Sequence, residues 1–148
     1  VPLRIAGDGP LESEVREWGE SFPGVELRRL RPLPEVYALM QEAVVLVLPS
    51  IWFETFGRVA AEAFATGLPV IASRLGAMAE IVQDTRTGLH FAVGDDDDLA
   101  EKVAWSFAHP EALREMGRRA REEYLAKYTA ERNYELLMDI YRGVGVTP

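Results

Sequence analysis

The sequence predicts an α/β fold in which helices cover an open parallel sheet. Short apolar runs alternate with segments whose apolar residues recur at helical spacing, from residue 3 to about residue 95. The run from Val44 to Leu48 is apolar without interruption, which is typical of a strand buried on both faces of a parallel sheet. Strands that alternate with helices are joined by right-handed crossovers, so we expect the strands to be parallel.

The expected elements follow in order along the chain. Strands are expected at 3–6, 25–27, 44–48, 70–72 and 89–93. Helices are expected at 11–22, 34–43, 57–66, 78–82, 96–108, 111–127 and 130–142. Pro34 suits the first turn of a helix because its fixed φ is already helical. The last helix carries an apolar stripe, for which core packing is the ordinary explanation: Tyr134, Leu137, Met138 and Tyr141.

Length and composition predict one soluble domain spanning residues 1–148. A chain of 148 residues with 48% hydrophobic residues is long enough to bury a core. The net charge of −8 argues against a surface that binds nucleic acid or anionic lipid. The absence of cysteine excludes disulfides and thiol chemistry, and it favours a cytoplasmic location. No apolar stretch is long enough to span a bilayer, and the residues from Val1 onward show no signal-peptide pattern.

Two glutamates, Glu54 and Glu62, lie eight residues apart, just after the apolar run that ends at Leu48. Glu54 lies in the loop after the expected strand, and Glu62 lies one turn into the next helix. In parallel α/β sheets, ligands bind at the carboxyl ends of strands, and helix N-termini attract phosphate. Each carboxylate can accept two hydroxyl donors, so the pair suits the hydroxyl groups of a sugar or a ribose.

Each of these residues also has a purely structural interpretation. Arg58 precedes Glu62 by four residues, so the two would form an ordinary ion pair on a helix surface. The rest of that helix is apolar almost all round, however, and an acid on a buried helix needs a partner or a cleft. Glu54 would complement the helix dipole. Gly57 serves either as a helix cap or as a point where the backbone approaches a ligand.

Other patterns that suggest a site are better explained by local structure. The turn Gly7-Asp8-Gly9 lacks the third glycine of a dinucleotide-binding fingerprint, because position 12 is Glu12. This argues against a nicotinamide enzyme and favours a tight strand-to-helix turn. The acidic run from Asp95 to Asp98 lacks the spacing of a calcium loop, and we expect it to cap a helix. His90 and His109 have no paired ligands nearby in the sequence, so we expect structural roles for them and no metal site.

The pair of glutamates belongs to a longer pattern. Glu54 and Glu62 match E-x7-E, and the run from Glu62 to Ser73 matches E-A-small-A-x-G-x-P-V-I/V-A-S/T in register with it. Residues 49–73 therefore resemble the C-terminal, nucleotide-sugar-binding domain of retaining family 4 glycosyltransferases of the GT-B fold (glycosyl transferases group 1). Further matches extend over nearly the whole chain: Ile5 to Pro10, Gly76 to Val82, Thr87-Gly88-Leu89, Gly94-Asp95, Asp98-Leu99-Ala100 and Met116-Gly117.

The resemblance implies a Rossmann-like, three-layer parallel sheet, which is the C-terminal half of a GT-B fold. It further implies that the chain lacks the first strand–helix unit of that half, which in the family supplies an arginine and a lysine for the donor diphosphate. The acceptor-binding N-terminal domain would also be absent. Residues 1–148 are thus expected to form a single nucleotide-sugar-binding domain, a fragment of a longer two-domain enzyme.

The resemblance also implies roles for the residues around the two glutamates. Glu54 is the catalytic candidate, in contact with hydroxyl groups of the donor sugar. Glu62 would accept hydrogen bonds from the ribose hydroxyls of the nucleotide. The backbone N–H groups of Thr55, Phe56 and Gly57 would point at the sugar and the phosphates.

Outside that segment, the implied contacts are less specific. Gly7 and Gly9 would border the nucleotide site. Glu80 either lines the site or caps a helix. Ala77 replaces a glycine of the family pattern G-G-x-P-E, and a positive φ at this position would make alanine costly and reshape the sugar end of the pocket. A small basic cluster is either solvated or in contact with the nucleobase or phosphate: Arg28, Arg29 and Arg31.

The implied activity is transfer of a sugar from a UDP-, GDP- or ADP-sugar to a sugar or lipid acceptor, with retention of anomeric configuration. By resemblance the reaction requires no metal and no cofactor besides the nucleotide-sugar. The acceptor would bind the absent N-terminal domain, so the isolated chain is expected to bind nucleoside diphosphate weakly and to be inactive. The last helix would cross to that domain, so its exposed stripe would favour self-association of the fragment. We expect the full-length protein in the cytoplasm, soluble or peripheral to the membrane.

Three alternatives to this function remain. A hydrolase would use Glu54 and Glu62 as its acid and its nucleophile or base, with carboxylates about 5–5.5 Å apart for retention or about 6.5–9.5 Å apart for inversion. A non-catalytic nucleotide-binding or interaction domain would keep the fold without the chemistry. A related GT-B epimerase or phosphorylase would need other residues in the half of the fold that is absent.

Overall fold

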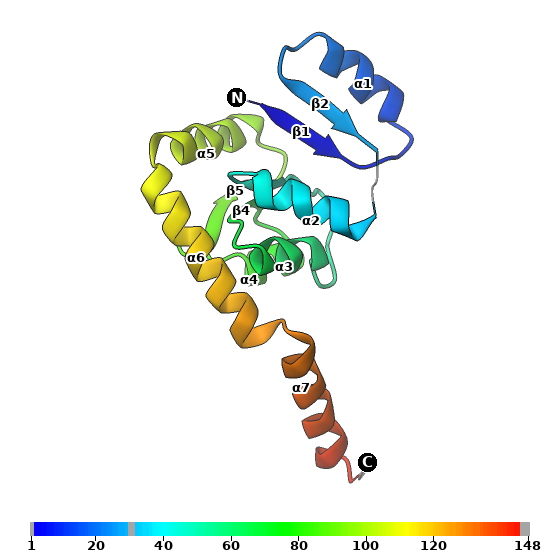
Figure 1. Ribbon diagram of the computed structural model, residues 1–148, viewed down its shortest axis with the longest axis vertical. Helices are drawn as coiled ribbons and strands as arrows, with labels where there is room; N and C mark the ends of the chain where they lie inside the picture. The colour runs from blue at the N-terminus through cyan, green and yellow to red at the C-terminus, as the bar shows by residue number, and fades with distance from the viewer. Residues whose placement is uncertain (1, 30–31, 146–148) are drawn as a thin grey trace. The chain divides into compact units, whose positions relative to one another are not determined.

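The computed structural model describes residues 2–29 and 32–145, which include neither Arg31 nor the last three residues. Its contacts divide the chain into two compact units, residues up to 39 and residues from 40 onward. The division falls inside the helix α2 (Leu33–Glu42). We describe each unit by itself (Figure 1).

The first unit is a strand–helix–strand motif. It contains β1 (Leu3–Ala6), α1 (Glu12–Glu20) and β2 (Val25–Arg28), and the two strands pair in parallel. α1 packs on β2 at Gly19, where an added Cβ would lie 3.3 Å from a methyl carbon of Val25. α1 is shorter than the predicted helix 11–22, so Leu11 and Phe22 of the expected stripe lie outside it. The rings of Trp18 and Phe22 still lie 4.7 Å apart, and both side chains are about half exposed.

The second unit contains a parallel sheet of three strands in the order β3-β4-β5. Its elements up to the end of this sheet are β3 (Leu46–Leu48), α3 (Arg58–Ala65), β4 (Val70–Ser73), α4 (Gly76–Ile81) and β5 (Gly88–Phe91). Every residue of β4 and β5 is buried. The alternation of parallel strands with helices confirms the predicted α/β fold, which is Rossmann-like.

The strand β3 differs from its prediction in length and burial. It begins at Leu46 rather than Val44, its residues are only partly buried, and Val44 is 57% exposed. The backbone N–H of Leu46 donates to the carbonyl of Pro69, at 3.0 Å. Pro69 has no N–H to donate, so the hydrogen bonds between β3 and β4 do not continue from Leu46 toward Val44. The prediction of a five-residue strand buried on both faces was therefore wrong.

Three long helices complete the second unit: α5 (Asp96–Ala108), α6 (Pro110–Lys127) and α7 (Ala130–Gly143). α5 and α6 both contact β5, and residues of the two helices and of β4 and β5 together form the core. Its buried members are Ile71, Leu89, Phe91, Leu113 and Met116. Among the helices of the described residues, none has both the length and the apolar character needed to cross a membrane.

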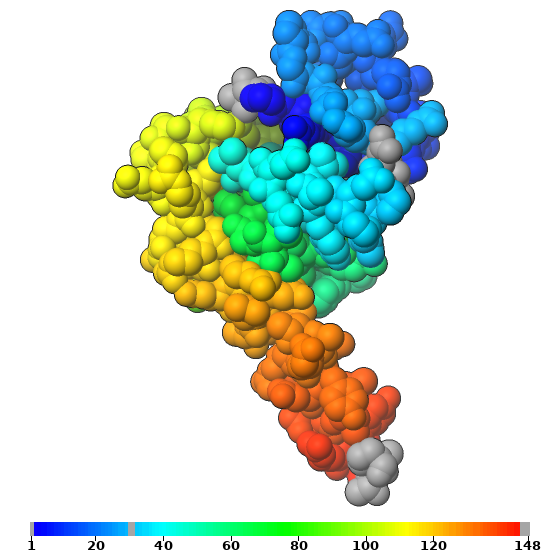
Figure 2. Space-filling model, viewed as in Figure 1, coloured from blue at the N-terminus to red at the C-terminus, as the bar shows by residue number. Residues whose placement is uncertain are grey.

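The helix α7 has no buried residue, and its side chains lie at the surface in orange to red in Figure 2. Tyr134 is 63% exposed and Leu137 is 44% exposed. The apolar stripe predicted for this helix exists, but core packing does not explain it, because nothing in the described part of the chain buries it. The N-cap residue of α7 is Thr129, whose side chain accepts a hydrogen bond from the backbone N–H of Arg132.

Candidate functional site

The loop 49–57 between β3 and α3 is held at the carboxyl edge of the second unit's sheet. The hydroxyl of Ser73, at the end of β4, donates to the carbonyl of Ser50 at 2.5 Å. The backbone N–H of Ala77 donates to the carbonyl of Glu54 at 3.3 Å. Because β3 and β4 are parallel neighbours, their carboxyl ends share one edge, and these bonds attach the loop to that edge.

Two glycines allow this loop to lie close to α4. Gly57 has φ 72°, and a Cβ at this position would lie 1.9 Å from the terminal methyl of Met78. Gly76 has φ 52°, and a Cβ there would lie 3.3 Å from the carbonyl oxygen of Glu54. Ala77 follows within α4 and has no positive φ, so the condition under which alanine 77 would be costly is not met. The left-handed conformation is taken by Gly76 instead.

Gly57 is the N-cap residue of α3, which confirms its interpretation as a helix cap. Its carbonyl accepts hydrogen bonds from the backbone N–H groups of Ala60 at 3.0 Å and Ala61 at 3.3 Å. No side chain caps this helix, and its first turn contains no acidic residue. A helix start of this kind has backbone N–H groups that suit an anion.

Glu62 is the fifth residue of α3 and forms the predicted pair with Arg58. The Nε of Arg58 lies 3.2 Å from Oε1 of Glu62. The two partners differ in burial, because the Arg58 side chain is 75% exposed and the Glu62 side chain only 15%. α3 buries its other face, through Ala60, Ala61, Ala63 and Phe64. The acid on this helix therefore has both of the features expected of it, a partner and partial shielding from solvent.

Glu54 and its aromatic neighbours are exposed. The side chain of Glu54 is open to solvent, as is that of Thr55. Phe56 meets the ring of Tyr128 edge to face at 6.3 Å, and burial raises the pKa of the Tyr128 phenol. Trp52 and Phe53, which precede Glu54, are 76% and 78% exposed. Sequence reasoning did not single out these two aromatic residues, although their position directly beyond a strand and a Pro-Ser turn was a usable signal.

Glu80 lies near the end of α4 and is exposed. The N-cap residue of this helix is Leu75, so the interpretation of Glu80 as a helix cap was wrong. Its role in lining the site stays a prediction. Arg74, which sequence reasoning missed, follows the end of β4 and is exposed; its backbone N–H donates to the carbonyl of Phe91 at 3.0 Å.

Gly7 and Gly9 belong to the first unit, where they form the expected tight turn. The N–H of Gly7 donates to the carbonyl of Arg28 at 3.0 Å, and the carbonyl of Gly9 accepts from the N–H of Glu12 at 3.0 Å. Gly9, Glu12 and Arg29 help to line a surface hollow of about 460 Å³. Whether this turn borders a nucleotide stays a prediction.

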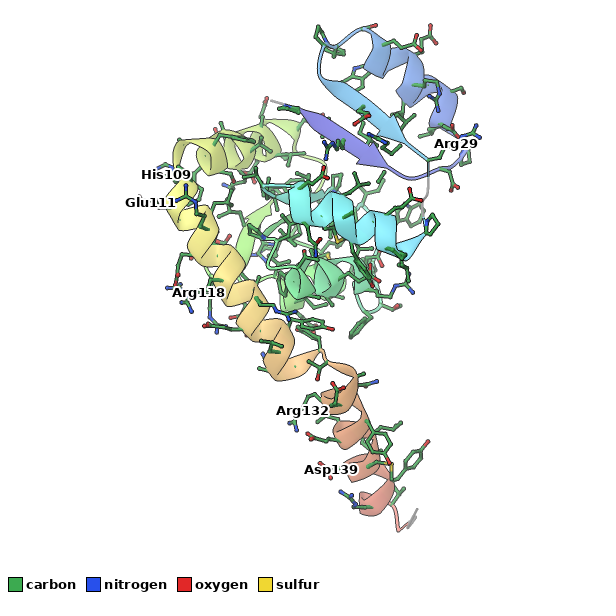
Figure 3. All side chains as sticks on the ribbon, viewed as in Figure 1. Arg29, His109, Glu111, Arg118, Arg132 and Asp139 are labelled. Carbon is green, nitrogen blue, oxygen red and sulfur yellow. The ribbon has the colours of Figure 1, made fainter. Side chains whose placement is uncertain are left out.

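The basic cluster of the first unit is paired with acids. Arg28 lies 2.6 Å from Glu26, and Arg29, labelled in Figure 3, lies 3.0 Å from Glu12. Hydrogen bonds from Arg16 and Arg29 lower the pKa of Glu12. The third predicted member, Arg31, lies outside the described residues. Both arginines thus have local ion pairs, and a contact of either with a nucleobase or phosphate stays a prediction.

The histidines have the structural roles expected of them. His90 is buried in β5, and its ring nitrogens lie 2.7 Å from the carbonyl of Val82 and 3.3 Å from that of Ala72. His109, labelled in Figure 3, stacks on Trp105 with ring centroids 4.4 Å apart and precedes α6. Within residues 2–29 and 32–145, no group of three or more acidic or histidine side chains is placed to hold a metal ion.

The acidic run Asp95–Asp98 caps α5, as predicted. Asp95 accepts a hydrogen bond from the N–H of Asp98 at 2.9 Å, and Asp98 accepts one from the N–H of Ala92 at 2.8 Å. Asp98 also pairs with Lys102 at 2.8 Å. A hydrogen bond from Lys102, followed by that from Ala92, lowers the pKa of Asp98. The carboxylates of Asp95 and Asp98 therefore bond to backbone N–H groups just after β5 and at the start of α5.

The carboxyl edge of the second unit therefore has two carboxylates, two arginines and a helix N-terminus without a side-chain cap: Glu54, Glu62, Arg58, Arg74 and the start of α3. Carboxylates accept hydrogen bonds from hydroxyl groups, while arginine and backbone N–H groups bind phosphate. On a Rossmann-like sheet, this set of groups has the chemistry that suits a phosphorylated, hydroxyl-rich ligand.

The chain belongs to the glycosyl transferases group 1 family, whose model matches residues 1–123. It is 33% identical over 141 residues to the alpha-maltose-1-phosphate synthase of Mycolicibacterium smegmatis, covering 90% of this chain and 36% of that protein. It is 34% identical over 143 residues to the D-inositol 3-phosphate glycosyltransferase of Corynebacterium urealyticum, covering 93% of this chain and 32% of that protein. The chain thus spans about a third of the length of these curated relatives.

Solved structures show the same fold. The sucrose-phosphate synthase of Thermosynechococcus elongatus matches with a TM-score of 0.84 and 29% identity, over 96% of this chain and 38% of that one. HepE from Anabaena, solved in complex with UDP, matches with a TM-score of 0.84 and 20% identity, over 96% of this chain and 41% of that one. The predicted α/β class and the resemblance to glycosyl transferases group 1 are both confirmed, and this chain is a domain of that family.

Proposed function

We propose that this chain is the donor-binding domain of a retaining glycosyltransferase, which transfers a sugar from a nucleotide-sugar to an acceptor. The observation that carries the proposal is the loop of Glu54, which is attached at the carboxyl edge of the sheet between β3 and the start of α3, a helix without a side-chain cap. Glu62 lies on that helix, partly shielded. UDP in the complex of HepE supports a nucleotide-sugar as the ligand.

In this proposal each group of the edge has a distinct role. Glu62 accepts hydrogen bonds from the ribose hydroxyls, and Glu54 is the catalytic residue that contacts hydroxyl groups of the donor sugar. The N–H groups of Thr55, Phe56 and Gly57 face the sugar and the phosphates. By family resemblance, Gly7 and Gly9 of the first unit would also border the nucleotide, and Glu80 would line the sugar end.

Catalysis would rest on positioning the donor and on stabilising the negative charge that develops on the leaving diphosphate. Backbone N–H groups at the start of α3 and nearby cations can stabilise this charge without reorganising. The reaction so described needs neither a metal ion nor a cofactor besides the nucleotide-sugar. The donor would be a UDP-, GDP- or ADP-sugar.

The acceptor, a sugar or a lipid, would contact another domain of a longer protein, because the chain spans about a third of its relatives, 36% and 32% of two of them. We therefore propose that the isolated chain binds nucleoside diphosphate weakly and does not transfer sugar. The exposed stripe of α7 would then mediate self-association of the isolated chain. In the cell the full-length protein would be cytoplasmic or peripheral to a membrane. Measurable sugar transfer by the 148-residue chain would contradict the proposed inactivity.

A thermal-shift titration with UDP, GDP, ADP and their sugar conjugates tests the donor site. A ligand that binds the folded state alone stabilises it by about 2.7 kcal/mol at a hundredfold excess over its Kd. We expect a shift with one base in the wild-type chain, and its loss in Glu62→Ala. Glu135→Ala is the matched control, because it removes a helical glutamate that pairs with Arg132 on α7, at 2.9 Å.

A shift that survives in Glu62→Ala at full size would argue against the ribose contact. If no nucleotide shifts the wild-type chain, the same titration on the longer protein decides whether the site needs further residues or binds no nucleotide at all.

A further inference from the structure

The ion pair between Arg58 and Glu62 joins an exposed side chain to a largely shielded one. A single guanidinium nitrogen, Nε of Arg58, lies 3.2 Å from a single carboxylate oxygen, Oε1 of Glu62. The arginine is 75% exposed and the glutamate 15%. The guanidinium therefore lies on the solvent side of a carboxylate that is otherwise largely shielded.

The position of this pair is poor for stabilising a helix. Arg58 is the first residue of α3, where a cation opposes the helix dipole. The arginine also precedes the glutamate, and at a spacing of four residues the opposite order is the more favourable one. In α5 and α6 the pairs Asp98–Lys102 and Glu123–Lys127 have the acid first, whereas Arg118–Glu122, away from the start of α6, has the base first. At the first residue of α3, helix stability thus favours Arg58 only weakly.

Building on the proposed function, we propose that Arg58 is a positioning residue for Glu62. Its Nε occupies Oε1 and fixes the rotamer of the carboxylate, which leaves Oε2 to accept hydrogen bonds from the vicinal hydroxyl groups of the nucleotide ribose. A carboxylate on a helix whose other face is buried needs such a polar neighbour to hold its orientation. Side chains on a helix also point back toward its N-terminus, so that both groups lie near the carboxyl edge of the sheet.

The test is a double-mutant cycle on nucleotide affinity, measured by calorimetry on the longest soluble form of the protein. The variants are Arg58→Met, Glu62→Ala and the double mutant, and the probes are UDP and 2′,3′-dideoxy-UDP, or the corresponding pair for the base that the titration selects. Arg58→Met should weaken UDP binding by about two- to fivefold, the range that exposed ion pairs span. It should leave dideoxy-UDP binding unchanged, and it should have no further effect in the Glu62→Ala background.

Two further variants separate positioning from simple charge. Arg58→Lys keeps a cation within reach of Glu62 and should retain most of the affinity. Arg132→Met removes an arginine that also precedes its glutamate in the first turn of a helix, α7, and should not change affinity. Arg132 is labelled in Figure 3. Melting of each variant without ligand identifies any loss of folding.

The outcomes distinguish the two proposals. An equal loss of UDP and dideoxy-UDP affinity in Arg58→Met, persisting in the Glu62→Ala background, would mean that Arg58 binds the phosphates directly and would overturn the positioning role alone. If Glu62→Ala itself leaves UDP affinity unchanged, the proposed function of this site fails and the positioning role fails with it.

Discussion

Two helices of the second unit begin after strands of the same parallel sheet, and their first turns have opposite chemistry. α5 follows β5 and begins with Asp95 as its cap, followed by three further aspartates. α3 follows β3 through the loop 49–57, begins at Gly57 without a side-chain cap, and has Arg58 in its first turn. One helix start satisfies its own N–H groups and repels anions, whereas the other has N–H groups without a side-chain acceptor and no acid in its first turn. The comparison favours the end of β3 over the end of β5 as the proposed ligand site.

The largest effect is expected from the glycines that precede the two helices. Gly57 and Gly94 have nearly the same left-handed φ, 72° and 74°. Alanine at either position should cost about 1–2 kcal/mol for that conformation. At position 57 the added Cβ also meets Met78 at 1.9 Å, whereas nothing lies within 4 Å at position 94. Overpacking adds about 1–3 kcal/mol, so Gly57→Ala should be the more destabilising variant in urea unfolding.

A matched variant checks the reason for this difference. Shortening the clashing side chain in Gly57→Ala/Met78→Ala should make the two substitutions less than additive, because the second removes the atom that the first one meets. Equal stability of Gly57→Ala and Gly94→Ala would show that packing against α4 does not decide the conformation of the loop.

Reversing the charge of Arg58 should make the first turn of α3 acidic, as the first turn of α5 is, and so make the start of α3 unfavourable for an anion. Arg58→Glu gives α3 an acidic first turn, so we expect about a tenfold weaker Kd for nucleoside diphosphate, through repulsion of phosphate and loss of the pair with Glu62. The control is Asp97→Arg in the first turn of α5, which should leave that Kd unchanged. Calorimetry measures both, and an effect of Asp97→Arg as large as that of Arg58→Glu would mean that overall charge governs binding.

Removing the cap of α5 should affect stability without affecting binding. Asp95→Ala deletes the hydrogen bond to the N–H of Asp98 and should lower the free energy of unfolding by about 1 kcal/mol. Asp95→Ser keeps a capping oxygen and should recover most of this loss. Urea denaturation provides the measurement, and weaker nucleotide binding in Asp95→Ala would place α5 in the ligand site.

The smallest expected effect is a loss of folding stability as the pH falls into the acidic range. The pKa of Asp98 is lowered in the folded chain, first by Lys102 and then by the N–H of Ala92. The pKa of Glu123 is also lowered: its burial opposes ionisation, but the ion pairs with Lys127 and Arg86 outweigh that cost. A lowered folded pKa contributes stability above the unfolded pKa, near 4, and this contribution is lost as pH falls through the folded value. Tm should therefore fall below about pH 4.5, and less steeply in Asp98→Asn/Glu123→Gln.

The start of α5 shows what local sequence can determine. The helix was predicted at 96–108 and found at Asp96–Ala108, because its cap, acidic first turn and apolar spacing all lie within a few residues of one another. The strand β4, predicted at 70–72 and found at Val70–Ser73, is equally local. The Arg58–Glu62 pair was also predictable, since a spacing of four residues on a helix brings two side chains together.

The candidate site depended on contacts that no spacing encodes. Ser73 bonds to Ser50 and Ala77 to Glu54 across more than twenty residues of chain, so only the folded sheet brings them together. The positive φ lies at Gly76 rather than at position 77, and an added Cβ at Gly76 would lie 3.3 Å from the carbonyl oxygen of Glu54.

The sequence by itself therefore determined the α/β class, the order of the elements, the caps and the family pattern, because these depend on residues near each other along the chain. The tertiary structure decided that β3 begins at Leu46, that Glu62 is shielded while Arg58 is not, and that α7 keeps its apolar stripe exposed. Burial is a property of what packs against a residue, and a pattern of apolar spacing identifies a face without identifying what covers it.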